Sequence, residues 1–206
     1  MGRKLWQTIP GTLLILASVI GACRGRADTE GTNESASRTD TAAVGADTAA
    51  AATTEAFTDA NIAALLDEAN KADSSAGAVA VKKASSPEVK RFARMMMGEH
   101  HALRLAGEKV VKQAKITPSA PANDPVTPLA QQETSVLDST PAGSGFDRAY
   151  IDQEVAAHRA VKDLLERSEG EADNPDLKAV IGKARPVVDR HLKEAEELQQ
   201  KLAEKA

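Results

Sequence analysis

The sequence predicts an all-α protein, a four-helix bundle made of two helical hairpins. Aromatic residues make up 2% of the 206 residues, so Ala, Leu and Val must supply most of the core. Such a composition favours helices over strands. Apolar residues recur at alternating spacings of three and four along four segments, the pattern of helices that face a common interior. Capping residues followed by proline, Ser86-Pro87 and Asn174-Pro175, indicate two helix starts.

The first predicted hairpin begins at Thr58, which suits an N-cap, with Phe57 placed to pack against Ile62. The turn at Ser85-Ser86-Pro87 ends this helix and starts the next, which we expect over residues 87–116. The inward-facing positions of the two helices are Ile62, Leu66, Ala69, Ala76 and Ala80, then Val89, Ala93, Met96, His100, Leu103, Gly107, Val110 and Ala114.

Residues 117–145 contain five of the nine prolines, and we expect no regular structure to run through them. They predict a long Pro-rich connection, disordered in part, to a second hairpin that starts near Phe146. Pro186 is expected to kink its last helix. Two hairpins with one long connection are typical of ferritin-like bundles, although up-down-up-down order stays open. The inward-facing positions are Asp147, Ile151, Glu154, His158, Val161 and Leu165, then Leu177, Ile181, Ala184, Val188, His191, Ala195, Leu198 and Leu202.

The N-terminal segment predicts export as a lipoprotein. Residues 1–22 combine two basic residues with a short apolar run. The sequence across the end of this segment, Ile20-Gly21-Ala22-Cys23, resembles a bacterial lipobox. By that resemblance Cys23 becomes the first mature residue, and its acyl chains anchor the protein in a membrane. Residues 23–56 then form a disordered tether to a domain over residues 57–204. Arg24 after the cysteine, instead of Asp, favours the outer membrane facing the periplasm if the organism has two membranes. The alternatives are an ordinary cleaved signal or a membrane anchor with an incidental cysteine.

Several short motifs in the helical region resemble one bacterial family. They are Phe92-Ala93-Arg94-Met95-Met96-Met97-Gly98-Glu99-His100, Phe146-Asp147-Arg148-Ala149-Tyr150, His158, Pro186 and His191-Leu192. Their order and spacing over residues 57–202 resemble the exported family called domain of unknown function 4142, which implies a ferritin-like fold and export but no activity. The chain departs from the family at Asp73-Ser74-Ser75, where members tend to carry Glu, and at Glu99, where many carry Asp.

The histidines are the strongest candidates for a functional site. His100, His158 and His191 fall on inward-facing positions of three helices, whereas His101 is one position off and is expected to face solvent. Asp73 lies 13 residues before Ser86 and His100 lies 13 residues after Pro87, so a tight turn brings them to one level. Similar estimates for the second hairpin predict that the bundle centre gathers five residues, Asp73, His100, Glu154, His158 and His191.

These five residues are candidate ligands for iron, zinc, copper or manganese. A standard di-iron site is not expected, because Glu154 and His158 are four residues apart and that site uses Glu-x-x-His. The alternative is a hydrogen-bonded network of buried polar groups that holds no metal. The Met95-Met96-Met97 run is interpreted as packing.

Three functions follow from these patterns. A net charge of −4 and few aromatic residues give no case for binding nucleic acid. The sequence also contains neither a phosphate-binding loop nor a nucleophile elbow, the motifs that would indicate an enzyme. The first hypothesis is therefore a non-enzymatic envelope lipoprotein, an interaction or stress-related module with an envelope protein partner. The second is a metal-binding or oxidoreductase bundle using His100, Glu154, His158 and His191. The third is a small-ligand carrier, with space left at Gly107 and Gly182.

Overall fold

The computed structural model describes residues 55–205, and this part of the chain contains helices and no strands. The all-α prediction is therefore confirmed. The predicted signal peptide and Cys23 lie outside the described residues. Within residues 55–205, no helix has the length and apolar character needed to cross a membrane. The helices are α1 (Asp59–Lys83), α2 (Pro87–Ala114), α3 (Thr127–Ser139), α4 (Ser144–Glu171) and α5 (Pro175–Ala203).

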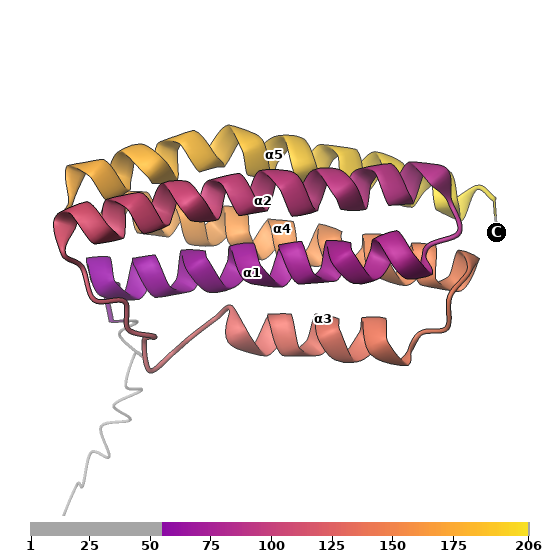
Figure 1. The fold of residues 1–206 in the computed structure, drawn as a ribbon, viewed down its shortest axis with the longest axis horizontal. Coiled ribbons are helices and arrows are strands. Elements are labelled where there is room, and N and C mark those ends of the chain that lie inside the picture. Colours follow the sequence, from indigo (N-terminus) through magenta and orange to yellow (C-terminus); the bar gives the residue numbers. More distant parts are fainter. Residues whose placement is uncertain (1–54, 206) are drawn as a thin grey trace, which may run out of the picture. The chain divides into compact units, whose positions relative to one another are not determined.

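Four long helices form the bundle as two antiparallel pairs, α1 with α2 and α4 with α5 (Figure 1). The backbone amide of Ser85, in the α1–α2 turn, donates to Asp147 near the start of α4. At the other end, the amide of Asn174 in the α4–α5 turn donates to Asp59 at the start of α1. Consequently α2 and α4 run in the same direction, and the connection between them traverses the bundle. This is the ferritin-type order, not up-down-up-down.

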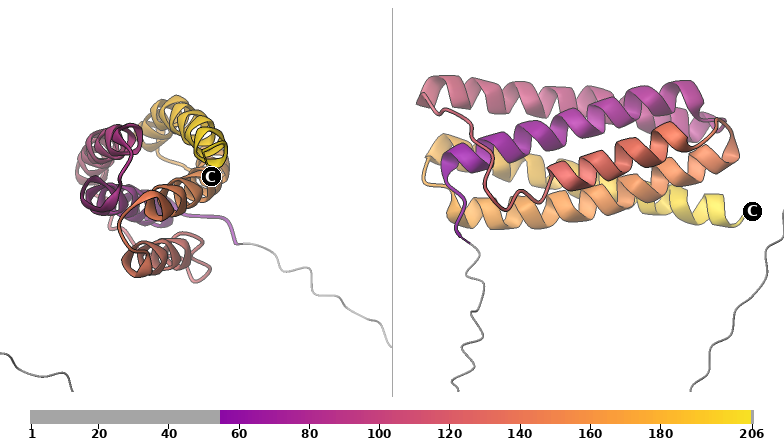
Figure 2. Two further views of the ribbon diagram at one scale, coloured as in Figure 1. Left: turned by 90° about the vertical axis from the view of Figure 1, so that its right-hand side faces the viewer. Right: turned by 90° about the horizontal axis from the view of Figure 1, so that it is seen from below.

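The connection contains a helix, so the expectation that residues 117–145 lack regular structure is wrong for α3. Pro128 lies in the first turn of α3, where a backbone donor is not needed, and the next proline, Pro141, follows the helix. The Asp124 carboxylate accepts hydrogen bonds from the amides of Val126 and Thr127 and orders this start. Figure 2 shows α3 lying along the outside of the bundle, where it packs against α1 and α4.

The starts of α1, α2 and α5 agree with the capping signals in the sequence. The Thr58 hydroxyl accepts from the Asn61 amide, the Ser86 hydroxyl from the Val89 amide, and the Asn174 side chain from the amides of Asp176 and Leu177. At the other end of α2, Lys115 adopts a left-handed conformation with φ of 55°, which ends the helix at Ala114, two residues before the expected end. α5 continues without interruption through Pro186, which is exposed.

A polar layer divides the bundle core into two apolar clusters. One cluster includes Phe92, Met96, Phe146, Tyr150, Ile151 and Leu198, and the other includes Ile62, Leu65, Leu165, Leu177, Ile181 and Val188. Each cluster shields one side of the layer from water. The layer consists of five buried side chains that the sequence assigned to the bundle centre, Asp73, His100, Glu154, His158 and His191.

Candidate metal centre

Three imidazole rings, one each from α2, α4 and α5, converge on a single point in the polar layer. Nε2 of His100 lies 3.4 Å from Nε2 of His158 and 3.2 Å from Nδ1 of His191, and the last two nitrogens are 3.4 Å apart. All three side chains are at most 2% exposed. The heptad spacing brings them together because each occupies an inward-facing position at the same height of the bundle.

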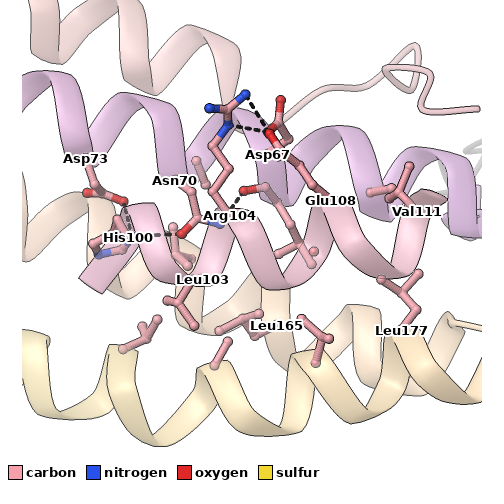
Figure 3. A pocket seen from close by; sticks show the side chains of 18 of the residues that line it. Asp67, Asn70, Asp73, His100, Leu103, Arg104, Glu108, Val111, Leu165 and Leu177 are labelled. Atoms are coloured by element: carbon pink, nitrogen blue, oxygen red, sulfur yellow. Dashed lines mark hydrogen bonds and ion pairs between the residues drawn. The ribbon is translucent and has the colours of Figure 1, made fainter. Parts of the chain in front are cut away.

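The outward nitrogen of His100 faces oxygen atoms of α1. Its Nδ1 lies 3.0 Å from Oδ1 of Asn70 and 3.3 Å from Oδ2 of Asp73 (Figure 3). The amide of Asn70 cannot be turned around, because its Nδ2 donates to the Leu66 carbonyl at 2.6 Å. Since both oxygens are acceptors, Nδ1 carries the proton and donates. The inward Nε2 of His100 therefore holds a lone pair.

The other two rings are oriented in the same way. Nδ1 of His158 lies 2.9 Å from the backbone carbonyl oxygen of Glu154, and Nε2 of His191 lies 2.9 Å from Oε2 of Glu99. A carbonyl and a carboxylate oxygen accept hydrogen bonds, so these outward nitrogens also carry the protons. All three inward nitrogens then present lone pairs to one another.

Three converging lone pairs cannot satisfy one another by hydrogen bonding, whereas a cation between them can. A tetrahedral metal that binds imidazole at about 2.0–2.1 Å holds its ligand atoms about 3.3–3.4 Å apart. The nitrogen separations of 3.2–3.4 Å match this requirement without rearrangement. The oxygens that orient the rings correspond to the outer partners that metal-bound histidines generally have. The donor set therefore fits a transition metal ion.

The electrostatics of the layer keep two of these rings neutral. Burial, reinforced by the neighbouring His100 and His158 rings and opposed by the hydrogen bond to Glu99, lowers the pKa of His191 to about 4. Burial also lowers the pKa of His158. Since a metal binds the neutral form of imidazole, these two rings are ready for binding at neutral pH.

Asp73 and Glu154 occupy a different place from the three converging nitrogens. The carboxylate of Asp73 lies on the outward side of His100, and Oε2 of Glu154 lies 3.3 Å from the outward Nδ1 of His158. The five predicted residues thus share one layer, but only the histidines point at the common centre. Asp73, Glu154 and His158 form a second group whose ligand atoms lie within 4.8 Å of one another.

A cavity of about 160 Å³ adjoins this layer between α1, α2, α4 and α5. His100, Asn70 and Asp73 lie at one end of it, and its wall is mostly apolar, with Leu103, Leu165 and Leu177 among the labelled side chains in Figure 3. Arg104 borders the cavity and pairs with Asp67 at 2.7 Å and with Glu108 at 2.9 Å. The cavity provides room for a small molecule beside His100.

Comparison with known proteins identifies the family. The sequence matches the family model "Domain of unknown function (DUF4142)" over residues 43–198. The chain belongs to this family. The solved structure of CopM in the Cu(II)-bound form resembles the structure of this chain with a TM-score of 0.58 at 14% sequence identity. The match covers 71% of this chain and 99% of the CopM chain. At this identity the likeness shows a shared fold. No curated protein matches the sequence.

The DUF4142 motifs contain the converging histidines. Of the residues that orient them, Asp73 and Glu154 were predicted as part of the site, whereas Asn70 and Glu99 were not. Asn70 lies one turn before Asp73 on the same side of α1, a spacing that could have indicated it. The sequence marked Glu99 only as a departure from the family pattern, not as a residue of the site. Glu133 of α3 is also buried in this region, and it was missed because α3 was not expected. His101 is exposed, as predicted.

Proposed function

We propose that this DUF4142 protein binds a transition metal ion through His100, His158 and His191. The observation that supports this most directly is the triangle of inward nitrogens with 3.2–3.4 Å sides, because each outward nitrogen faces an oxygen acceptor. A network without metal would leave three lone pairs opposed in a buried layer, at a cost in stability. Metal binding therefore takes precedence over a metal-free interaction module.

Copper is the first candidate. Divalent copper binds nitrogen sites more tightly than the neighbouring divalent metals do, and the fold resembles that of CopM, whose structure is the Cu(II)-bound form. Zinc also suits three imidazoles. Three protein ligands leave one position of a tetrahedral ion for water or a small molecule. An open position of this kind is typical of catalytic metal sites, whereas structural sites use four protein ligands.

The experiment compares metal binding by the full protein, purified without a histidine tag and stripped with chelator, with that of two variants. We expect one equivalent of Cu²⁺ in a competition titration and a weaker, measurable affinity for Zn²⁺. His158→Ala should lower the Cu²⁺ affinity at least 100-fold. His101→Ala is the matched control, since His101 is exposed and adjacent to His100. Less than a tenth of an equivalent bound, or equal losses in both variants, would contradict the proposal.

We propose further that the metal-binding domain works outside the cytoplasm as a membrane-anchored lipoprotein. The lipobox-like Ile20-Gly21-Ala22-Cys23 supports this, and so do the apolar run before it and the polar composition of residues 23–56. Cells fed labelled palmitate should incorporate the label into the protein and lose this incorporation in Cys23→Ala. An unlabelled wild-type protein, or one recovered without membranes, would contradict the anchor.

The cavity beside His100 favours a second candidate function, the binding of a small apolar molecule. Its volume of about 160 Å³ is close to that of an engineered apolar cavity, about 150 Å³, which binds benzene. Gly107 lines it, whereas Gly182, the other glycine with predicted space, is exposed and does not.

Benzene serves as the probe for this cavity. Saturating benzene should raise the melting temperature of the wild type and have no effect on Gly107→Leu, whose new side chain fills the cavity. Gly98→Leu, at an exposed glycine of the same helix where an added β-carbon would meet no atom within 4 Å, should respond like the wild type. A wild type that ignores benzene, or equal responses in all three proteins, would exclude this function.

A further inference from the structure

A compartment of buried carboxylates lies next to the three histidines, on the side where α3 covers the bundle. It contains Asp73 of α1, Glu133 of α3 and Glu154 of α4, which are 2%, 5% and 0% exposed. Within residues 55–205, the basic side chains that these carboxylates approach within 4.0 Å are the rings of His100 and His158, and no Lys or Arg pairs with them. Three helices thus bring acidic groups into the interior without a matching basic side chain.

Several polar atoms in this compartment have no hydrogen-bond partner among residues 55–205. These atoms are Oε1 of Glu133, the hydroxyl oxygen of Tyr150, and the two side-chain oxygens of Glu154. Tyr150 is an independent observation, because it is not acidic and its fully buried hydroxyl lies beside Glu154. A buried polar atom without a partner costs stability, and a buried carboxylate needs a proton or a cation. Protons or a bound cation must therefore satisfy the carboxylate oxygens of this compartment.

The surroundings also provide room for additional ligands. A cavity of about 80 Å³ borders Asp73 and Glu133 between α1, α3 and α4. The wall of this cavity is mostly apolar, and water molecules fit at its polar end, where Asp73 and Glu133 supply acceptors. Cations that prefer oxygen ligands commonly combine a few carboxylates with water. The outward Nδ1 of His158 already donates to the Glu154 carbonyl, so the ligands on this side are oxygens.

We propose that Asp73 and Glu154, which belong to a group of ligand atoms within 4.8 Å of one another, form a second cation site for a divalent ion that prefers oxygen ligands. Glu133 faces this site from the adjoining cavity, and the Tyr150 hydroxyl lies beside it. The site is separate from the three-histidine centre and does not require that centre to be filled. Glu133 is the only acidic side chain of α3 that is buried. A bound ion would therefore tie the crossover helix to α1 and α4.

Manganese is the probe, because the signal of free Mn²⁺ in electron paramagnetic resonance falls as the ion binds. We expect the full, chelator-stripped protein to bind one equivalent of Mn²⁺ at pH 7.5. Glu133→Gln should weaken binding at least tenfold, whereas Asp138→Asn, at an exposed acidic residue of the same helix, should not. Amide hydrogen exchange over residues 127–139 should slow on adding Mn²⁺ to the wild type. If Glu133→Gln fails to fold, Glu154→Gln serves in its place.

His191→Ala separates this proposal from the three-histidine centre. A variant that keeps its Mn²⁺ while losing Cu²⁺ supports two sites. Loss of Mn²⁺ in His191→Ala together with normal binding in Glu133→Gln would mean that Mn²⁺ occupies the histidines, which overturns the second site and leaves the first intact. No Mn²⁺ binding by the wild type would also overturn it.

Discussion

Oε2 of Glu99 on α2 lies 2.9 Å from Nε2 of His191 on α5, and the same oxygen contacts the guanidinium of Arg190. Glu99 thereby determines which nitrogen of His191 carries the proton and holds the ring toward His100 and His158. Outer partners of this kind affect metal affinity nearly as strongly as some ligands do.

Glu99→Gln should weaken Cu²⁺ binding by about 10-fold, the lower end of the range for outer-partner substitutions. The amide oxygen of Gln can still accept from His191, but the negative charge that strengthens the imidazole as a ligand is lost. Glu196→Gln is the control, because Glu196 pairs with Arg159 on the surface of the same bundle. A competition titration measures both. An affinity for Glu99→Gln equal to that of the control would show that Glu99 does not act on the centre.

Metal binding should stabilise the folded protein. A ligand that binds only the folded state contributes about 2.7 kcal/mol when its free concentration is 100 times its dissociation constant. Urea unfolding with and without Cu²⁺ should show this gain in the wild type and in His101→Ala. His158→Ala should show none, because one corner of the nitrogen triangle is removed. An equal gain in all three proteins would place the metal elsewhere.

The sequence allowed the bundle and its histidines to be predicted because both depend on periodicity. Spacings of three and four select one face of a helix, so His100, His158 and His191 had to face the interior once the helices packed. Their mutual height followed from the short turns, which fix the register of each hairpin. The capping residues Thr58, Ser86 and Asn174 act locally, so the helix starts at these positions could also be predicted from the sequence.

Other parts of the site depend on contacts that spacing does not determine. Glu99 is one position off the inward-facing row, and its role depends on the rotamer that carries it to α5. Glu133 reaches the interior only because α3 folds between Pro128 and Pro141 and packs on α1 and α4. A count of prolines gave the wrong expectation there, since Pro128 in the first turn starts a helix instead of breaking it.

Asp147 illustrates an inward-facing residue with a structural role. It is buried, and its carboxylate accepts from the amides of Ser85 and Ser86 at 2.8 and 2.9 Å and from the Ser85 hydroxyl. Asp147→Ala should destabilise the protein by about 2–4 kcal/mol, because buried donors lose a charged acceptor. Asp152→Ala, at an exposed residue of the same helix, should cost much less. Urea unfolding measures both, and similar losses would rule out this role.

Gly77 lies where α1 packs tightly against α2. A β-carbon there would lie 2.8 Å from the Ala93 carbonyl oxygen and 2.9 Å from Cγ of Met97. The Met97 side chain can move, but the backbone oxygen moves only if the helices separate. Gly77→Ala should therefore destabilise the protein by about 1–3 kcal/mol.

Gly98→Ala is the opposite case on the facing helix. A β-carbon at Gly98 meets no atom of residues 55–205 within 4 Å. Gly98→Ala should therefore stabilise the folded protein by about 0.4–1 kcal/mol, because alanine lowers the conformational entropy of the unfolded chain. Chemical denaturation of the two variants checks both signs. A stabilising Gly77→Ala would mean that the helices tolerate a wider separation.

Glu133 makes the stability of the metal-free protein depend on pH. Burial, with a smaller contribution from Asp73, raises the pKa of Glu133 from its ordinary value of 4.5 to about 8. The folded protein thus retains a proton that the unfolded chain releases, and this proton contributes stability. The contribution is complete below pH 4.5 and is lost as the pH rises through 8.

Glu133→Gln removes this dependence, because the amide is neutral throughout. In the presence of chelator, the variant should be more stable than the wild type by about 1–3 kcal/mol at pH 8 and similar to it at pH 4.5. Asp73, Glu154 and Tyr150 also face this compartment, so the measured quantity is the difference between the two proteins at each pH. Asp138→Asn should follow the wild type. If Glu133→Gln also followed it across the range, Glu133 would be ionised in contact with water, and the compartment between α1, α3 and α4 would be open to water in solution.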